Sequence, residues 1–190
     1  MNHAGTIRIL AISGSLRRAS SNSALVEAAA TLAPDTVEMS IYRGLAELPA
    51  FNPDLDGDGT PEAVTTFRTA LQACDAVLIS SPEYAHGVPG AVKNALDWVV
   101  GSGELIDKPV AIINASARAT HAWASLAETL RVMSARVILD ASITVSLGGR
   151  TIDANGFVAN AELSTALRFA IGALAAAARC SDFPAMKDAS

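Results

Sequence analysis

Short apolar segments alternate with longer amphipathic segments along most of this chain, and this alternation restricts the fold more than any other feature of the sequence. The short segments predict strands at 7–13, 37–41, 76–80, 109–114 and 137–139, with an extension of the last one to 145 left open. The longer segments predict helices at 21–32, 61–73, 90–100, 121–134 and 161–179. Apolar strands that are separated by helices form a parallel sheet covered on both faces. The sequence therefore predicts a doubly wound α/β fold.

Composition and charge exclude several classes of protein. Hydrophobic residues make up 51 % of the 190 residues, too many for a disordered chain, and no apolar run reaches the roughly 18 residues of a membrane span. The net charge of −5 and the lack of a Lys/Arg cluster argue against a nucleic-acid partner. The N-terminus does not read as a signal peptide, so we expect a cytoplasmic protein that does not bind membranes. The length fits one domain over residues 1–190, with a core at about 7–180.

The loop that would follow the first strand has the chemistry of a phosphate site. It contains one glycine, two arginines and several hydroxyl or amide side chains, and it leads directly into the first predicted helix. Hydroxyls, backbone N–H groups and the positive end of a helix dipole all favour an anion. The segment matches neither GxGxxG nor GxxxxGK[ST], which argues against a Rossmann dinucleotide site and a P-loop. The residues alone leave open an ordinary helix start capped by Ser20, Ser21 or Asn22.

The loop that would follow the third strand is stiff. Residues 81–90 read SPEYAHGVPG and hold two prolines and two glycines. Such a turn can present backbone N–H and C=O groups to the edge of a planar heterocycle, and Tyr84 adds a flat face. A rigid connection without any function would explain the same residues, so this loop alone does not separate the two interpretations.

Other catalytic and metal-binding patterns in the sequence are incomplete or absent. Residues 54–59 (DLDGDG) resemble the start of an EF-hand loop, but the twelfth position is Thr65, so we interpret the segment as a solvated turn. The two cysteines form no spacing suited to zinc, and no metal site is predicted. A GxSxG elbow and a cysteine in the first loop are both missing, which excludes a serine hydrolase and a low-molecular-weight phosphatase. The sequence shows no orienting partner for His86 or His121, so no catalytic acid or base is predicted.

Taken together, two motifs resemble the NADPH-dependent FMN reductase family, whose members include chromate- and quinone-reducing enzymes. The motifs are GSLRRASSN at 14–22 and PEYAHGVPGAVKNALDW at 82–98, and they keep their order and their places after the first and third strands. The resemblance covers roughly residues 7–180. It implies a flavodoxin-like three-layer sandwich, with a five-stranded parallel sheet in the order 2-1-3-4-5 and helices on both faces.

The resemblance also implies which residues bind the cofactors. The FMN phosphate would be held by Ser15, Arg17, Ser20, Ser21 and Asn22. One side of the flavin ring would be lined by Pro82, Glu83, Tyr84, Ala85, His86 and Gly87, and Ser116 would touch the other side. Arg118 would either meet the 2′-phosphate of NADPH or pair with a neighbouring carboxylate. Where this chain has Ala85 the family commonly has asparagine, and the loop at 116–123 lacks the glycine-rich stretch of many members.

The implied function is that of an FMN-dependent NAD(P)H oxidoreductase. NADPH or NADH would deliver hydride to flavin N5, and the electrons would pass to a small acceptor such as a quinone, an azo compound, a metal oxyanion or free flavin. Backbone N–H groups of residues 84–87 would stabilise negative charge on the reduced ring. The resemblance implies a homodimer or homotetramer, with the helix at 91–100 at an interface. Two alternatives stay open: a flavodoxin-type electron carrier, and a binding domain without enzymatic activity.

Overall fold

A computed structural model of the chain describes residues 5–147 and 150–180. Its strands are all parallel and form one sheet in the order β2-β1-β3-β4-β5. This confirms the predicted α/β fold and the strand order that the family resemblance implies. The strands are β1 (Ile7–Ser13), β2 (Val37–Tyr42), β3 (Ala76–Ser80), β4 (Pro109–Ile113) and β5 (Arg136–Val137).

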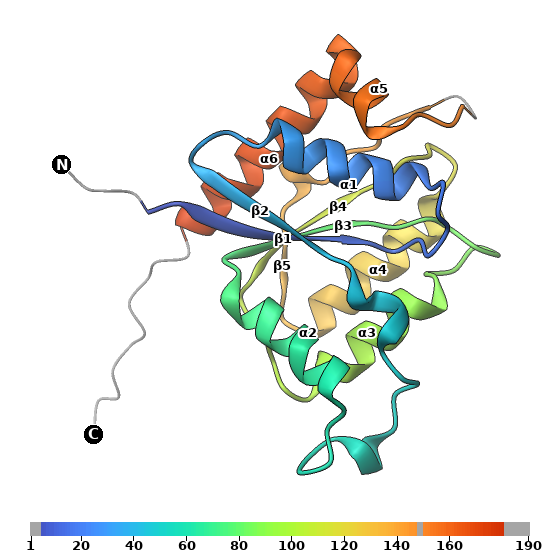
Figure 1. Cartoon of the computed structure of the whole chain (residues 1–190), viewed down its shortest axis with the longest axis vertical. Helices are drawn as coiled ribbons and strands as arrows, with labels where there is room; N and C mark the ends of the chain where they lie inside the picture. Colours follow the sequence, from blue (N-terminus) through green and yellow to red (C-terminus); the bar gives the residue numbers. More distant parts are fainter. Residues whose placement is uncertain (1–4, 148–149, 181–190) are drawn as a thin grey trace.

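Helices cover both faces of the sheet, as Figure 1 shows. One face carries α1 (Ser21–Leu32), α5 (Ala154–Ala159) and α6 (Ala161–Arg179). The other face carries α2 (Glu62–Ala73), α3 (Gly90–Val100) and α4 (Thr120–Val132). Short 3₁₀ helices lie in the connections: η1 (Gly44–Glu47), η2 (Pro53–Leu55) and η3 (Leu139–Ala141).

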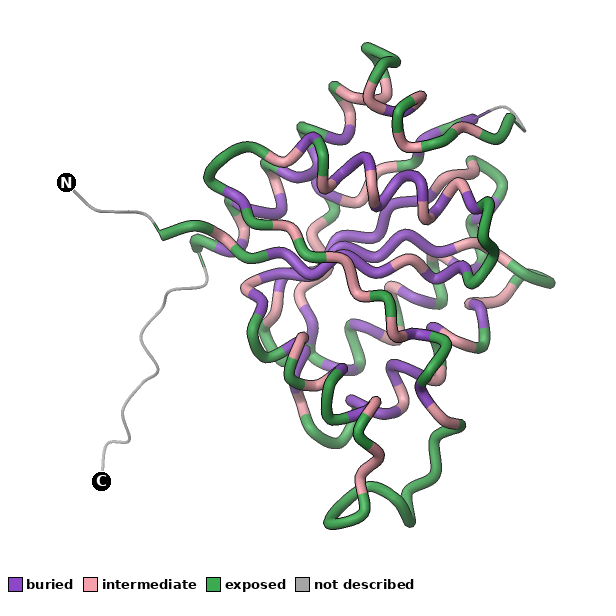
Figure 2. The backbone as a smooth tube through the Cα atoms, viewed as in Figure 1, coloured by how far each residue is buried: buried purple, intermediate pink, exposed green. Residues whose placement is uncertain are grey.

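The strands separate two hydrophobic cores, because successive side chains of a strand point to opposite faces of the sheet. Ile9 and Ala11 of β1 pack in the core under α1 and α6, whereas Leu10 and Ile12 pack against α2 and α3. Every residue of β3 and β4 is buried, which explains why both strands are apolar apart from Ser80 at the end of β3. Figure 2 shows the buried strands between the two half-exposed helical layers.

The last strand is shorter than predicted. The chain leaves the sheet after Val137 and forms η3, and it pairs again beside the end of β4 through a bridge between Asn114 and Thr144. In between, the side chain of Ser142 replaces a backbone partner: its Oγ accepts a hydrogen bond from the N–H of Ile112 at 3.0 Å. A side chain that completes a ladder in this way leaves no signal in the hydrophobic pattern.

Other boundaries differ by one or two residues, and short elements were not predicted. α4 begins at Thr120 and ends at Val132, and β4 ends at Ile113. Pro61 lies just before α2 as its N-cap residue, where its carbonyl accepts hydrogen bonds from Val64 and Thr65. α5 and the 3₁₀ helices have six residues or fewer, too few to show a helical period.

Within the described residues, α6 is long and apolar enough to cross a membrane when length and composition alone are considered. In the structure one side of α6 is buried against the sheet and α1, through residues such as Leu167, Ile171 and Leu174. The helix also carries Glu162, Arg168 and Arg179. The apolar residues on this side of α6 therefore belong to the core of the domain.

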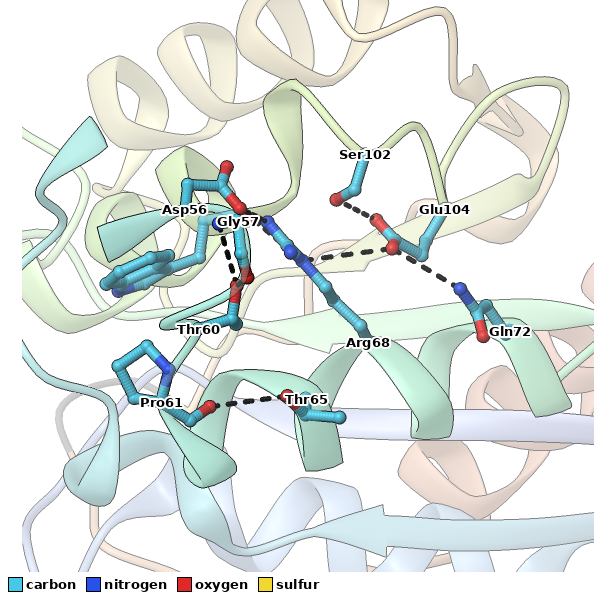
Figure 3. A network of polar contacts seen from close by, with 10 residues as sticks. Asp56, Gly57, Thr60, Pro61, Thr65, Arg68, Gln72, Ser102 and Glu104 are labelled. Atoms are coloured by element: carbon cyan, nitrogen blue, oxygen red, sulfur yellow. Dashed lines mark hydrogen bonds and ion pairs between the residues drawn. The ribbon is translucent and has the colours of Figure 1, made fainter. Parts of the chain in front are cut away.

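Arg68 of α2 joins three distant segments in the network drawn in Figure 3. Its Nη2 donates to Asp56 at 2.8 Å and to the carbonyl of Trp98, while its Nε lies 3.9 Å from Oε1 of Glu104. Only 2 % of the Glu104 side chain is exposed, and Oε2 of Glu104 also accepts from Ser102 at 2.6 Å. Residues 54–59 are exposed, as expected for a solvated turn, and Asp56 also anchors this turn to α2.

We predict that Arg68→Met lowers the free energy of unfolding by about 3 kcal/mol, because it leaves the buried Glu104 carboxylate without its cation. Urea unfolding followed by circular dichroism measures the change. The control is Arg131→Met, which removes an exposed pair with Glu128 and should barely move the midpoint. Equal midpoints for the two variants would show that the network does not hold these segments together.

Candidate functional site

The loops that follow β1, β3 and β4 meet at the carboxyl edge of the sheet. Their strands end in register, with Ser13 beside Ser80 and Ser80 beside Ile113. A cavity of ≈ 380 Å³ opens between these loops. Ligands of doubly wound sheets bind at this edge, where the chain turns from one side of the first strand to the other.

Gly14 lets the first loop pass close to the third. Its N–H donates to the carbonyl of Ser80 at 2.7 Å. A Cβ atom at this position would lie 2.7 Å from Oγ of Ser81 and 2.7 Å from Cγ2 of Val92, closer than real side chains approach. Any larger residue would therefore push the two loops apart.

The first loop ends in a capped helix. Oγ of Ser20 accepts a hydrogen bond from the N–H of Asn22 at 3.2 Å, so Ser20 is the N-cap among the three residues that the sequence allowed. Asn22 is buried, and its Oδ1 accepts from Oγ of Ser80 at 2.9 Å. The N-terminus of α1 is thus fixed to β3 and faces the cavity together with Ser15 and Arg17.

The third loop turns sharply at residues 84–87. Tyr84 and Gly87 exchange two backbone hydrogen bonds of 3.1 and 2.9 Å, and the two residues between them have left-handed backbones, with φ of 49° for Ala85 and 60° for His86. Alanine pays a steric penalty in this region, whereas asparagine and glycine tolerate it. This explains in physical terms why asparagine suits the position of Ala85.

Glu83 links the third loop to the fourth. One of its carboxylate oxygens accepts a hydrogen bond from the N–H of Ala122 at 2.8 Å, in the first turn of α4. The residue before α4, Ala119, provides no side-chain cap of its own. Glu83 therefore caps α4 from a different loop, and its negative charge favours the positive end of the helix dipole.

Asn114 shapes the fourth loop. Its Nδ2 donates to the carbonyl of Ala119 at 2.8 Å, and its Oδ1 accepts from the N–H of Ser116 at 3.0 Å. Only 5 % of Asn114 is exposed, and it lines the cavity. Asn114 was not among the site residues expected from the sequence, although an amide directly after an apolar strand was the signal that could have identified it.

The structure brings most of the predicted site residues together around the cavity. Those that line it are Ser15, Arg17, Ser20, Ser21, Asn22, Pro82, Glu83, Tyr84, Ser116 and Arg118. Ala85, His86 and Gly87 do not line it. The exposed ring of His86 instead stacks on His121 of α4, with centroids 4.3 Å apart. Lining residues that were not predicted are Ala19, Ser81, Asn114, Ala115, Ala119 and Thr151.

The cavity has two chemically different ends. Around the N-terminus of α1 it offers hydroxyls and the guanidinium of Arg17, a set of groups that suits a phosphate. At the other end it is bounded by Pro82 and by Tyr84, of which 52 % is exposed. Glu83 is the only carboxylate among the described residues that line it, and that carboxylate is bonded to Ala122. An elongated anion with a flat ring fits this arrangement.

Comparison with known proteins gives a consistent result. Residues 7–149 match the family model of the NADPH-dependent FMN reductases. The NAD(P)H-dependent FMN reductase of Pseudomonas aeruginosa is 34 % identical over 155 residues, which is 79 % of this chain and 83 % of that protein. The NADPH:quinone oxidoreductase of Arabidopsis thaliana is 41 % identical over 112 residues, covering 57 % of each chain. The structure of FerB, a flavoenzyme NAD(P)H:acceptor oxidoreductase from Paracoccus denitrificans, superimposes with a TM-score of 0.73 at 28 % identity, over 90 % of this chain and 97 % of that one.

We predict that Glu83→Ala destabilises the protein by about 1 kcal/mol, because α4 loses its cap. Glu83→Gln should retain most of the stability, since an amide oxygen can accept from Ala122 but brings no charge to the helix dipole. Thermal unfolding of the three proteins measures their stability, which should decrease from the parent to Glu83→Gln to Glu83→Ala. If Gln and Ala are equally unstable, the hydrogen bond is not what matters.

A second prediction concerns the strained turn. Ala85→Gly should raise the free energy of unfolding by roughly 1 kcal/mol, because glycine adopts the left-handed backbone without a Cβ clash. The matched control is Ala124→Gly in α4, where the same substitution should destabilise by about 1 kcal/mol. Urea unfolding of both variants measures the change in the free energy of unfolding, which should be positive for Ala85→Gly and negative for Ala124→Gly. A loss of stability in Ala85→Gly would contradict the prediction.

Proposed function

Because the chain belongs to the NADPH-dependent FMN reductase family, we propose that it is an FMN-dependent NAD(P)H oxidoreductase that reduces a small acceptor such as a quinone. The observation that carries this proposal is the cavity at the carboxyl edge of the sheet. It joins a hydroxyl-rich helix N-terminus, with a cation beside it, to a rigid turn with a flat side chain. We propose one FMN-binding domain for residues 1–190, working in the cytoplasm.

The cavity fits FMN in size and in chemistry. Its volume of ≈ 380 Å³ lies in the range of small-molecule sites. We assign the phosphate to Ser15, Arg17, Ser20, Ser21 and Asn22, where hydroxyls, an arginine and the first turn of α1 converge. The flavin ring is assigned to the space between the turn at residues 82–87 and the loop that contains Ser116 and Arg118.

Bound FMN supplies the hydride and electron transfer, and the side chains of the protein supply no acid or base in this proposal. The chain positions the group. Gly14 and the Asn22–Ser80 hydrogen bond hold the phosphate end, and Glu83 holds the third loop against α4. The result is a site whose walls are in place before the ligand binds, which lowers the cost of orienting it.

The backbone of the turn also has a role in this proposal. The N–H groups of Tyr84 and Gly87 already bond to each other's carbonyls. The N–H groups left to stabilise negative charge on the reduced ring are those of Ala85 and His86, which follow the cavity-lining Tyr84 but do not line the cavity themselves. This is a narrower assignment than all of residues 84–87. Among the described residues, the N–H groups of Ala85 and His86 take part in neither backbone hydrogen bond of the turn.

We also propose that the chain forms a homodimer or homotetramer through the region of α3. Val100, at the end of α3, and Ile106 beyond it are 59 % and 58 % exposed, so they offer apolar surface that a second copy of the chain would bury. Light scattering of the purified chain would overturn this part of the proposal by giving the mass of a single chain.

The test of function is an anaerobic visible spectrum of the FMN-loaded chain before and after NADPH is added. We expect the flavin band to bleach. Bound flavin that stays oxidised would indicate an electron carrier, and failure to bind FMN would leave a binding domain without this activity.

We predict that Arg17→Gln weakens FMN binding about tenfold in the same preparation, since a charge-assisted hydrogen bond to phosphate is lost. The adjacent Arg18→Gln, which changes the charge equally but lies outside the cavity lining, should not.

A further inference from the structure

A second hollow, of ≈ 400 Å³, adjoins the cavity assigned to FMN. It lies between the loop after β4 and the segment that follows β5. The two hollows share Ser21, Ala115, Ser116, Arg118 and Thr151. The second one adds Ser146 and Arg150, among others. Because a wall is common to both, one elongated ligand can occupy part of each.

The second hollow carries positive charge without a counter-charge. Its described lining residues include Arg118 and Arg150 and no carboxylate. Within the described parts of the chain, ion pairs engage Arg8, Arg43, Arg68 and Arg131 but neither of these two. Among the described residues, the guanidinium of Arg150 donates a hydrogen bond to the carbonyl of Leu147 alone, at 3.4 Å. In a chain of net charge −5, two arginines that face one hollow without a carboxylate indicate an anionic ligand.

The neighbouring groups define what kind of anion fits. Four hydroxyls, those of Ser21, Ser116, Ser146 and Thr151, line the same hollow. Guanidinium forks and hydroxyls together suit the oxygens of a phosphate. FMN has a single phosphate, and the loop at 14–22 with Arg17 already provides donors for it. The second hollow therefore has room and charge for a phosphate from the other substrate.

We infer that the hollow between Arg118 and Arg150 binds the 2′-phosphate of NADPH and makes the chain prefer NADPH to NADH. The inference rests on the proposed function, because it assumes that a nicotinamide nucleotide approaches the flavin from this side. NADH lacks the 2′-phosphate, so it offers no anion to these two guanidinium groups. Of the two roles that the sequence left open for Arg118, nucleotide binding is favoured, since no described carboxylate pairs with it.

The test uses calorimetry on the FMN-loaded protein, without turnover. The probes are adenosine 2′,5′-bisphosphate and adenosine 5′-monophosphate, which differ by the 2′-phosphate. We expect the parent to bind the bisphosphate more tightly. Arg150→Gln should weaken binding of the bisphosphate about tenfold and change the affinity for the monophosphate by no more than about twofold. The double variant with Arg118→Gln should bind the bisphosphate about a hundredfold more weakly than the parent. Arg179→Gln, an equal charge change at the far end of α6, serves as the control.

Each other outcome overturns the inference. If the parent binds both probes equally, or neither, the hollow is not a 2′-phosphate site. If Arg150→Gln weakens both probes equally, the arginine acts on the 5′-phosphate. If it weakens FMN binding instead, measured by flavin fluorescence, the hollow belongs to the FMN phosphate. These results leave the oxidoreductase function intact, whereas a flavin that NADPH does not bleach in the parent would remove the function itself.

Discussion

The close approach of two backbones at the centre of the sheet is the constraint on which the site depends. β1 and β3 are neighbours although β2 lies between them in sequence, so the chain must cross from one side of β1 to the other. This reversal places the loops after β1 and β3 beside each other at the carboxyl edge. Gly14 allows the contact, because a Cβ there would collide with Ser81 and Val92. Without this approach the helix N-terminus and the rigid turn would not share one cavity.

Polar side chains at the strand ends then fix the loops to one another. Asn22 bonds to Ser80, Glu83 caps α4, and Asn114 organises the backbone up to Ala119. Asn22, Glu83 and Asn114 each line the cavity and also hold part of the local structure in place. Substitutions here therefore change stability and ligand binding together, and only pairs such as Glu83→Gln and Glu83→Ala separate the two effects.

Charge is distributed unevenly over the molecule. The chain is acidic overall, yet Arg17, Arg118 and Arg150 gather around two adjoining hollows at one edge of the sheet. Elsewhere many arginines pair with carboxylates, as Arg68 does with Asp56. A local positive field on an acidic protein attracts anionic nucleotides to one face, and such attraction weakens as salt is added.

The sequence alone determined the fold class, because short apolar runs between amphipathic helices have few other ways to be buried. It also located the two loops of the site, since hydroxyls, arginines, prolines and glycines concentrate in them. Only the tertiary structure decided how these residues are used. Glu83 caps a helix 39 positions away and Asn22 bonds to a strand 58 positions away, and Arg150 joins Arg118 from a different loop. Such pairings arise because the sheet brings distant strand ends to one edge, and a local pattern of residues carries no record of that proximity.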